Sequence, residues 1–172
     1  MADLRKLIEK YLKEAKLMQL ATSIDNQPWV CSVWFATDEK MNIYWFSSIT
    51  RRHSKEVIKN KKVAAAIVIP QTPDDPPRGL QLEGIAELLT DQKDIDKAMS
   101  VYAGRIFSRS IIEDFIKDKQ KPHKFYKLRP TKFVLFDVVN FPKQSRQEFI
   151  SLKLNTIHYN LLTFKRSFKN CI

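Results

Sequence analysis

The residues best suited to chemistry lie in one short segment, 47–55, which reads Ser-Ser-Ile-Thr-Arg-Arg-His-Ser-Lys. The apolar run before it predicts a strand, and Thr50 is a suitable N-cap for a short helix that begins near Arg51. The first turn of a helix carries unpaired N–H groups and the positive end of the helix dipole, so it attracts anions. Arginine, histidine and hydroxyl side chains at the same place favour a phosphate site. From local sequence alone, an exposed basic turn with an ordinary cap explains the segment equally well.

No hydrolytic or metal-binding motif accompanies this segment. His53, His123 and His158 are scattered and form no His-x-x-x-His pair, and Cys31 and Cys171 lie far apart in the chain. Cys31 stands among apolar residues of a predicted strand, which is typical of a buried, inert thiol rather than a nucleophile. With three glycines the chain cannot form a glycine-rich phosphate loop. We therefore expect no resident metal and no catalytic cysteine.

Apolar periodicity and turn residues predict the elements that must position this segment. Strands are expected over 17–24, 29–36, 42–48, 63–69, 80–89, 125–128 and 132–139. Helices are expected over 3–16, from about 51, from 91, and over 110–116. Gly84 within the fifth strand is expected to mark a bulge. Short connections between successive strands favour a closed antiparallel β-barrel with α-helices, which is a mainly β fold class.

Composition and charge bound the classes of protein that this chain can belong to. It has 172 residues, 44% of them hydrophobic, which is enough for one domain with a packed core. The longest apolar run, Val63 to Ile69, is far too short to cross a bilayer, and charged residues near the N-terminus argue against a secretory signal. The two cysteines form no disulfide framework, so we expect a cytoplasmic protein that does not enter membranes.

The net charge of +11 is concentrated in the last third of the chain. Residues 121–172 hold 11 basic and 2 acidic side chains, whereas the first 120 residues are nearly balanced. We expect a main domain over 1–149 and a basic C-terminal extension over 150–172. Apolar residues interrupt the extension, which is typical of a segment that packs on the domain or on a second subunit. A basic extension also attracts nucleic acid, but no RNA-binding motif is present, so this partner is not expected.

An ordered series of short motifs runs through roughly residues 5–142. The segments are 20–23, 27–29, 43–48, 51–60, 63–67, 80–87, 125–130 and 133–137. They include Arg-Arg-His-Ser-Lys at 51–55, Leu-Gln-Leu-Glu-Gly-Ile-Ala-Glu at 80–87 and Phe-Tyr-Lys-Leu-Arg-Pro at 125–130. In order and spacing these motifs resemble the pyridoxamine 5′-phosphate oxidase-like family. The resemblance implies a split β-barrel that binds FMN at a homodimer interface.

The resemblance also implies which residues contact FMN. Carried over position by position, they are Ser32, Val33, Phe46, Ser47, Arg52, His53, Ser54 and Gln81. Arg52 and His53 take the positions that hold the FMN phosphate, and Ser54 would donate a further hydrogen bond. Phe46 and Ser47 take strand positions beside the pyrimidine edge of the flavin.

Three further positions, on two other strands, complete the implied flavin site. Ser32 and Val33 take backbone-contact positions on the second strand, and Gln81 lies near a position whose polar side chain meets the flavin.

The chain departs from the true oxidase elsewhere. Cys31 stands where that enzyme has an arginine, Ala36 stands where it has a lysine for the substrate phosphate, and its C-terminal tryptophan and arginine motif has no counterpart. The flavin pocket is therefore expected to be present, and the vitamin B6 pocket is not.

These observations lead to one main hypothesis and three alternatives. The main hypothesis is an FMN-binding oxidoreductase that works as a homodimer on a small-molecule substrate of unknown identity. The alternatives within the same barrel are haem, for which His123 and His158 would be the candidate axial ligands, and a deazaflavin in place of FMN. A non-catalytic flavin-binding or interaction protein is the remaining alternative.

Overall fold

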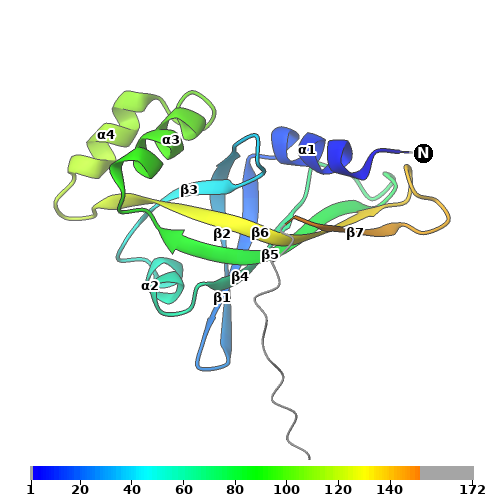
Figure 1. Ribbon diagram of the computed structural model, residues 1–172, viewed down its shortest axis with the longest axis horizontal. Coiled ribbons are helices and arrows are strands. Elements are labelled where there is room, and N and C mark those ends of the chain that lie inside the picture. Colours follow the sequence, from blue (N-terminus) through cyan, green and yellow to red (C-terminus); the bar gives the residue numbers. More distant parts are fainter. Residues whose placement is uncertain (1, 152–172) are drawn as a thin grey trace, which may run out of the picture.

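A computed structural model describes residues 2–151 of the chain (Figure 1). The order of elements is α1 (Leu4–Glu14), β1 (Leu17–Ile24), β2 (Gln27–Thr37), β3 (Ile43–Ser48), α2 (Arg52–Lys59), β4 (Lys62–Ile67), β5 (Arg78–Leu88), α3 (Gln92–Tyr102), α4 (Arg109–Lys117), β6 (His123–Asp137) and β7 (Arg146–Ile150). Asp25 and Asn26 both have positive φ between β1 and β2, as tight hairpin turns require. No helix of the described part is long and apolar enough to span a membrane.

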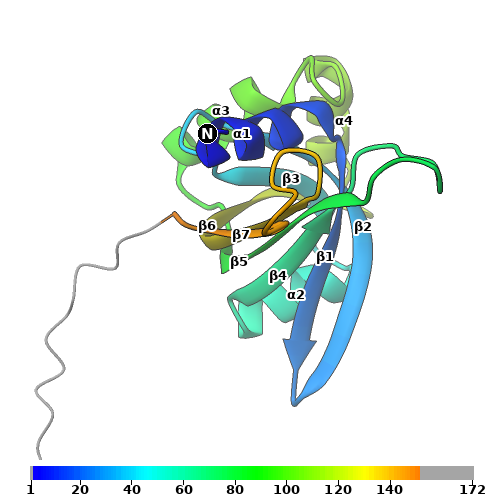
Figure 2. The same ribbon diagram turned by 90° about the vertical axis from the view of Figure 1, so that its right-hand side faces the viewer.

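The strands form one antiparallel sheet that closes on itself. Its order is β3-β2-β1-β4-β5-β6-β7, and an additional pairing of β3 with β6 closes a ring. β1, β2 and β3 are joined as consecutive neighbours, because short turns allow successive antiparallel strands to pair directly. The expected mainly β barrel with helices is confirmed. Figure 2 shows the β1–β2 hairpin extending beyond the rest of the ring.

The molecule has two apolar cores because the sheet is covered on both sides at one end. Inside the ring lie the inward-facing strand residues, sealed by α1 through Ile8 and Leu12, which are fully buried. Outside the ring, α3 and α4 cover the outer face of β3 and β6, where Tyr44, Tyr102 and Phe125 pack together. Figure 1 shows α3 and α4 on one side of the sheet and α2 on the other. No helix of residues 2–151 covers the outer face of β1, β4 and β5 (Figure 2).

Two features of the C-terminal half differ from the sequence prediction. The strands expected over 125–128 and 132–139 are one continuous strand, β6. Pro130 is accommodated there because it lies opposite Gly84, at the register shift between Glu83 and Gly84. Gly84 therefore marks a bulge, as expected, and the extra residue of the bulge, Thr131, is on β6. β7, which was not predicted, adds to the outer edge of β6 and runs to Ile150, across the domain boundary expected after residue 149. The remainder of the expected extension, from residue 152, lies outside the described residues.

Candidate functional site

The N-terminus of α2 differs from the other helix N-termini of the described part. Asp3, Asp91 and Ser108 each accept a hydrogen bond from the first turn of their helix, but Arg51, the N-cap of α2, makes no side-chain cap. Within the described residues, no acceptor meets the N–H groups of residues 52–54. These donors and the helix dipole create a positive potential at this point. Thr50, the expected cap, instead pairs its hydroxyl with that of Ser48 at 2.9 Å.

His53 lies in the first turn of α2 and is oriented by the end of β3. Its Nε2 atom is 2.8 Å from the Ser47 hydroxyl, and both residues are buried. Burial and, to a smaller extent, the charge of Arg51 lower the pKa of His53 below its usual value, so the imidazole is neutral at pH 7. When Ser47 donates to Nε2, the remaining ring proton sits on Nδ1, for which the described residues offer no acceptor.

Arg52 is held from two sides. Its Nε atom donates to Glu56 Oε1 at 2.7 Å, and its guanidinium carbon lies 4.3 Å above the centre of the Trp29 ring. Glu56 is almost completely buried and also accepts a hydrogen bond from the Thr22 hydroxyl. Burial raises the pKa of Glu56, but the hydrogen bonds from Thr22 and Arg52 outweigh it, so the pKa is lowered on balance. This carboxylate is therefore ionised at neutral pH.

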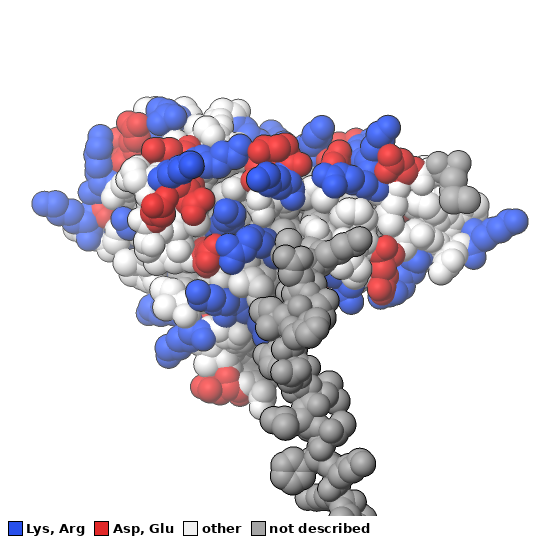
Figure 3. Space-filling model, in the orientation of Figure 1, with Lys and Arg blue, Asp and Glu red and all other residues white. Residues whose placement is uncertain are grey.

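Basic side chains surround this end of the molecule. Arg51, Lys55, Lys59 and Lys61 are exposed on α2 and the turn that follows it. Figure 3 shows Lys and Arg gathered over the region of α2. None of these four makes an ion pair within the part of the chain that the structure describes. The N-terminus of α2 is therefore an electropositive site with directed hydrogen-bond donors, which suits a phosphate group.

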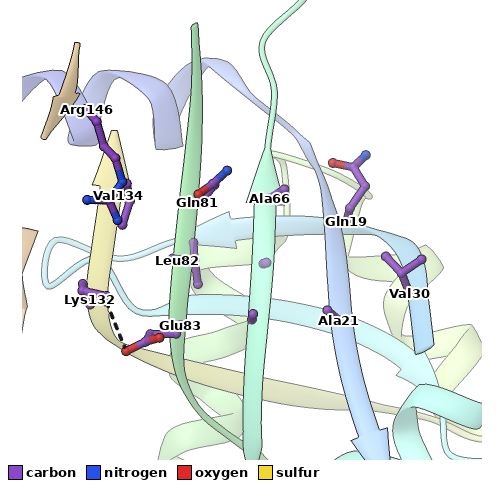
Figure 4. Close-up of a pocket in the computed structure, with 12 residues that line it drawn as sticks. Gln19, Ala21, Val30, Ala66, Gln81, Leu82, Glu83, Lys132, Val134 and Arg146 are labelled. Carbon is purple, nitrogen blue, oxygen red and sulfur yellow. Dashed lines mark ion pairs between the residues drawn. The ribbon is translucent and has the colours of Figure 1, made fainter. Parts of the chain in front are cut away.

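Other expected site residues lie on a second face, the outer side of β2, β1, β4 and β5. Ser32 is opposite Gln19, Gln19 is opposite Ala66, and Ala66 is opposite Gln81, so these residues form one row across four strands. All of the row except Ser32 lines an open cavity of about 450 Å³, whose floor includes alanines of β1 and β4 (Figure 4). Gln19 and Gln81 stand on either side of Ala66 in this view. We refer to this surface, with its cavity, as the outer face.

The remaining expected residues point into the protein. Ser54 has no exposed surface, and its hydroxyl has no hydrogen-bond partner in the described structure, so it faces the barrel interior rather than the first-turn donors. Val33 is buried in the barrel core. Phe46 packs against Phe125 under α3 and α4, with ring centroids 4.8 Å apart. The structure thus brings Ser47, Arg52 and His53 together and places Ser32 and Gln81 on the outer face.

The structure adds three residues that sequence reasoning missed as members of the site: Thr22, Trp29 and Glu56. The spacing of Arg52 and Glu56 by four residues on a helix is the one signal that indicates their pairing. Thr22 is 34 positions from Glu56, so no local pattern connects them. Cys31 is half-buried rather than buried as expected, and burial together with the nearby Glu56 carboxylate raises its pKa to about 11, which favours an unreactive thiol.

The closed antiparallel ring of strands with helices defines the class as a small β-barrel protein. A family model described as pyridoxamine 5′-phosphate oxidase matches residues 4–136. The chain therefore belongs to the pyridoxamine 5′-phosphate oxidase family, as the motifs indicated. No curated protein matches it in sequence.

Solved structures share this fold at low sequence identity. A haem-binding protein from Mycobacterium smegmatis is 15% identical with a TM-score of 0.69, over 88% of this chain and 60% of that one. The haem storage protein HutZ from Vibrio cholerae is 16% identical with a TM-score of 0.63, over 87% and 95%. An FAD-binding protein from Mesorhizobium loti is 18% identical with a TM-score of 0.58, over 75% and 89%. At these identities the similarity shows the fold alone.

Proposed function

We propose that this chain is an FMN-binding flavoprotein whose α2 N-terminus holds the phosphate of the flavin. The observation that carries the proposal is the absence of a side-chain cap on α2 among the described residues, with Arg51, Arg52 and His53 at the same point. An uncapped first turn is stabilised by an anion, and a phosphate monoester accepts several hydrogen bonds at once. Family membership and the FAD-binding structural relative support a flavin as the ligand.

The residues of the site fit a phosphate. The first-turn N–H groups supply donors that have no acceptor in the described part of the chain, and His53 Nδ1 supplies another when Ser47 donates to Nε2. Arg51 supplies a positive charge that has no ion-pair partner among the same residues. Ser47 fixes the orientation of the His53 ring. When bound, FMN would supply the redox chemistry, while the chain binds and orients it. The activity that follows is that of an oxidoreductase acting on a small molecule, whose identity we leave open.

We extend the proposal to a cytoplasmic homodimer with the flavin at the subunit interface. The outer face supports a second copy, because it is an open surface with an alanine floor and exposed apolar residues around it. Ser32 and Gln81 lie on this face rather than beside Arg52, so a flavin that contacts both groups has to extend between them. A second copy over the outer face would cover the part of the flavin that one barrel leaves exposed.

Titration of the purified protein with FMN, followed by quenching of flavin fluorescence, tests the proposal. Arg52→Ala should weaken FMN binding by about 1.5–3 kcal/mol, or roughly 10- to 150-fold, the usual contribution of a hydrogen bond to a charged group. Arg5→Ala removes an arginine of the same type from α1 and should leave the affinity unchanged. A wild-type protein that releases all its FMN on desalting would contradict the proposal. Chromatography of the released flavin separates FMN from FAD and riboflavin.

A haem protein is the second candidate, because one ring nitrogen of His123 is held by the backbone and the residue lines a cavity, so it could hold a haem iron. Its Nδ1 atom is 2.7 Å from the Lys121 carbonyl oxygen, and its ring packs against Phe46 and Phe115 with centroids 5.3 and 4.8 Å away. Among the described residues Nε2 has no hydrogen-bond partner, and the residue borders a cavity of about 320 Å³ beside Met99. Two of the structural relatives are haem proteins by name.

Haemin titration decides between the two cofactors. A Soret band that persists after desalting and disappears in His123→Ala would favour haem over FMN. His158, the other candidate ligand, lies outside the described residues. A protein that takes up FMN and gives no Soret band would remove this candidate.

A further inference from the structure

A buried carboxylate stands next to the proposed phosphate site. Glu56 is 5% exposed, lies one helical turn after Arg52, and accepts hydrogen bonds from Arg52 and Thr22. A negative charge near a phosphate is unfavourable, and a buried charge costs free energy unless it is fully paired. The stability of α2 alone does not account for a buried carboxylate at this position.

The geometry of Arg52 provides this explanation. Glu56 occupies its Nε atom, and the Trp29 ring covers one face of its guanidinium group. Its two terminal Nη groups meet no acceptor within the described residues. An arginine side chain normally has many rotamers, and each must be given up when it binds an anion. Fixing the guanidinium beforehand removes this entropic cost and leaves the terminal nitrogens directed at an incoming ligand.

We propose that Glu56, supported by Thr22, is a positioning residue that presents the terminal nitrogens of Arg52 to the phosphate of the flavin. This inference rests on the proposed function above. It gives the site a preference for phosphorylated flavin over riboflavin, because the oriented guanidinium contributes only when the ligand carries a phosphate. Glu56 acts through Arg52 and does not itself touch the ligand. Removing both side chains should therefore reduce FMN affinity no more than removing that of Arg52 alone.

The experiment measures the dissociation constants of FMN and riboflavin for the wild type, Glu56→Ala, Glu56→Gln, Arg52→Ala and the double variant R52A/E56A. Glu56→Ala should weaken FMN binding about tenfold, which is within the range of coupling energies measured between residues in contact. The same variant should leave riboflavin binding unchanged. Glu56→Gln should retain most of the FMN affinity, since its amide oxygen still accepts from Arg52 and its amide nitrogen can donate to Thr22. The double variant should bind FMN as Arg52→Ala does.

The chain offers a matched control on another helix. Arg5 and Glu9 on α1 form a pair of the same spacing, with Arg5 Nε 2.9 Å from Glu9 Oε1, and both are more exposed than Glu56. Glu9→Ala should change neither affinity. A ¹H–¹⁵N spectrum of the arginine Nε–H groups adds a measurement that needs no flavin. The Arg52 signal should be protected from exchange in the wild type and in Glu56→Gln, and exposed in Glu56→Ala.

The possible outcomes separate this inference from the function on which it rests. If Glu56→Ala and Glu56→Gln both bind FMN more tightly, Glu56 opposes the phosphate by its charge, and the positioning role is refuted. Equal losses of FMN and riboflavin affinity would show that Glu56 only stabilises the fold. Unchanged FMN binding in Glu56→Ala, with normal binding by the wild type, refutes the inference and leaves the proposed function standing. A wild type that binds no FMN refutes both.

Discussion

At the scale of single residues, the lowered pKa of His53 makes the stability of the protein depend on pH. Its folded-state pKa is lowered by burial and by Arg51, so the unfolded chain binds the proton more readily. Stability is therefore greatest above the ordinary histidine pKa of about 6.5 and declines as the pH falls from there through the folded-state pKa. We expect the urea midpoint of unfolding to fall between pH 7 and pH 5 in the wild type. The decline should be smaller in His53→Asn, which cannot take up this proton.

The pH window separates this effect from that of Glu56. The pKa of Glu56 is lowered from 4.5, so its contribution is present at pH 5 and is lost only on further acidification. Equal pH dependence in the wild type and in His53→Asn would show that His53 titrates alike in the folded and unfolded chains.

Only some residues of the candidate site can be predicted from the sequence. Arg52 and His53 can be recognised because they are basic residues at a predicted strand-to-helix turn. The helix N-terminus at such a turn attracts anions. Glu56 and Thr22 are not, because their pairing depends on α2 packing against β1, a contact between distant segments. Ser54 is the opposite case. Its hydroxyl suits a phosphate, but its place on the helix turns it toward the core.

At the scale of elements, the long strands β5 and β6 depend on one glycine. A Cβ atom on Gly84 would lie 2.3 Å from the Arg129 carbonyl oxygen and 2.8 Å from Pro130 Cα, both of them backbone atoms. Backbone of a paired strand cannot move aside cheaply, so Gly84→Ala should lower the free energy of unfolding by about 3 kcal/mol, at the upper end for overpacking. Gly79→Ala, on the same strand with nothing within 4 Å, should change it little. Urea unfolding of both variants measures these free energies. Equal free energies of unfolding for the two variants would show that β5 and β6 can move apart to accommodate the added Cβ atom.

Most elements could be predicted from the sequence because their signals are local. Apolar spacing indicates α1, α3 and α4, and apolar runs bounded by turn residues indicate the first five strands. The division of β6 was wrong because Pro130 normally interrupts a ladder, and only the bulge opposite Gly84 lets it stay in one. β7 was missed because its five residues have no clear alternation of their own. It forms because the exposed edge of β6 offers unpaired hydrogen-bonding groups.

At the scale of the whole molecule, the outer face is the part of the surface least suited to water. Around its alanine floor stand Val30, which is 59% exposed, Val68, Phe136 and Ile150. Register places the outward residues of β6 and β7 on this same face, because Val134 is opposite Glu148 and Phe136 is opposite Arg146. Exposed apolar side chains that gather on one face mark an interaction surface. The ends of the barrel and the far side of β3 are already covered by helices, so this is the face that our homodimer proposal assigns to the second copy.

The homodimer proposal leads to a test at this scale. In a two-fold symmetric interface every substitution enters twice, so Val30→Arg would place two desolvated charges in the contact. Because Val30 is exposed in the single barrel, the variant should fold normally but sediment as a monomer, with a dimer dissociation constant raised on the order of 100-fold. Ile111→Arg, at an exposed apolar residue of α4 on another face, should remain dimeric. If the flavin lies at the interface, Val30→Arg should also lose FMN affinity as the subunits separate. A Val30→Arg protein that stays dimeric would place the interface elsewhere, and a monomer with full FMN affinity would place the flavin entirely within one barrel.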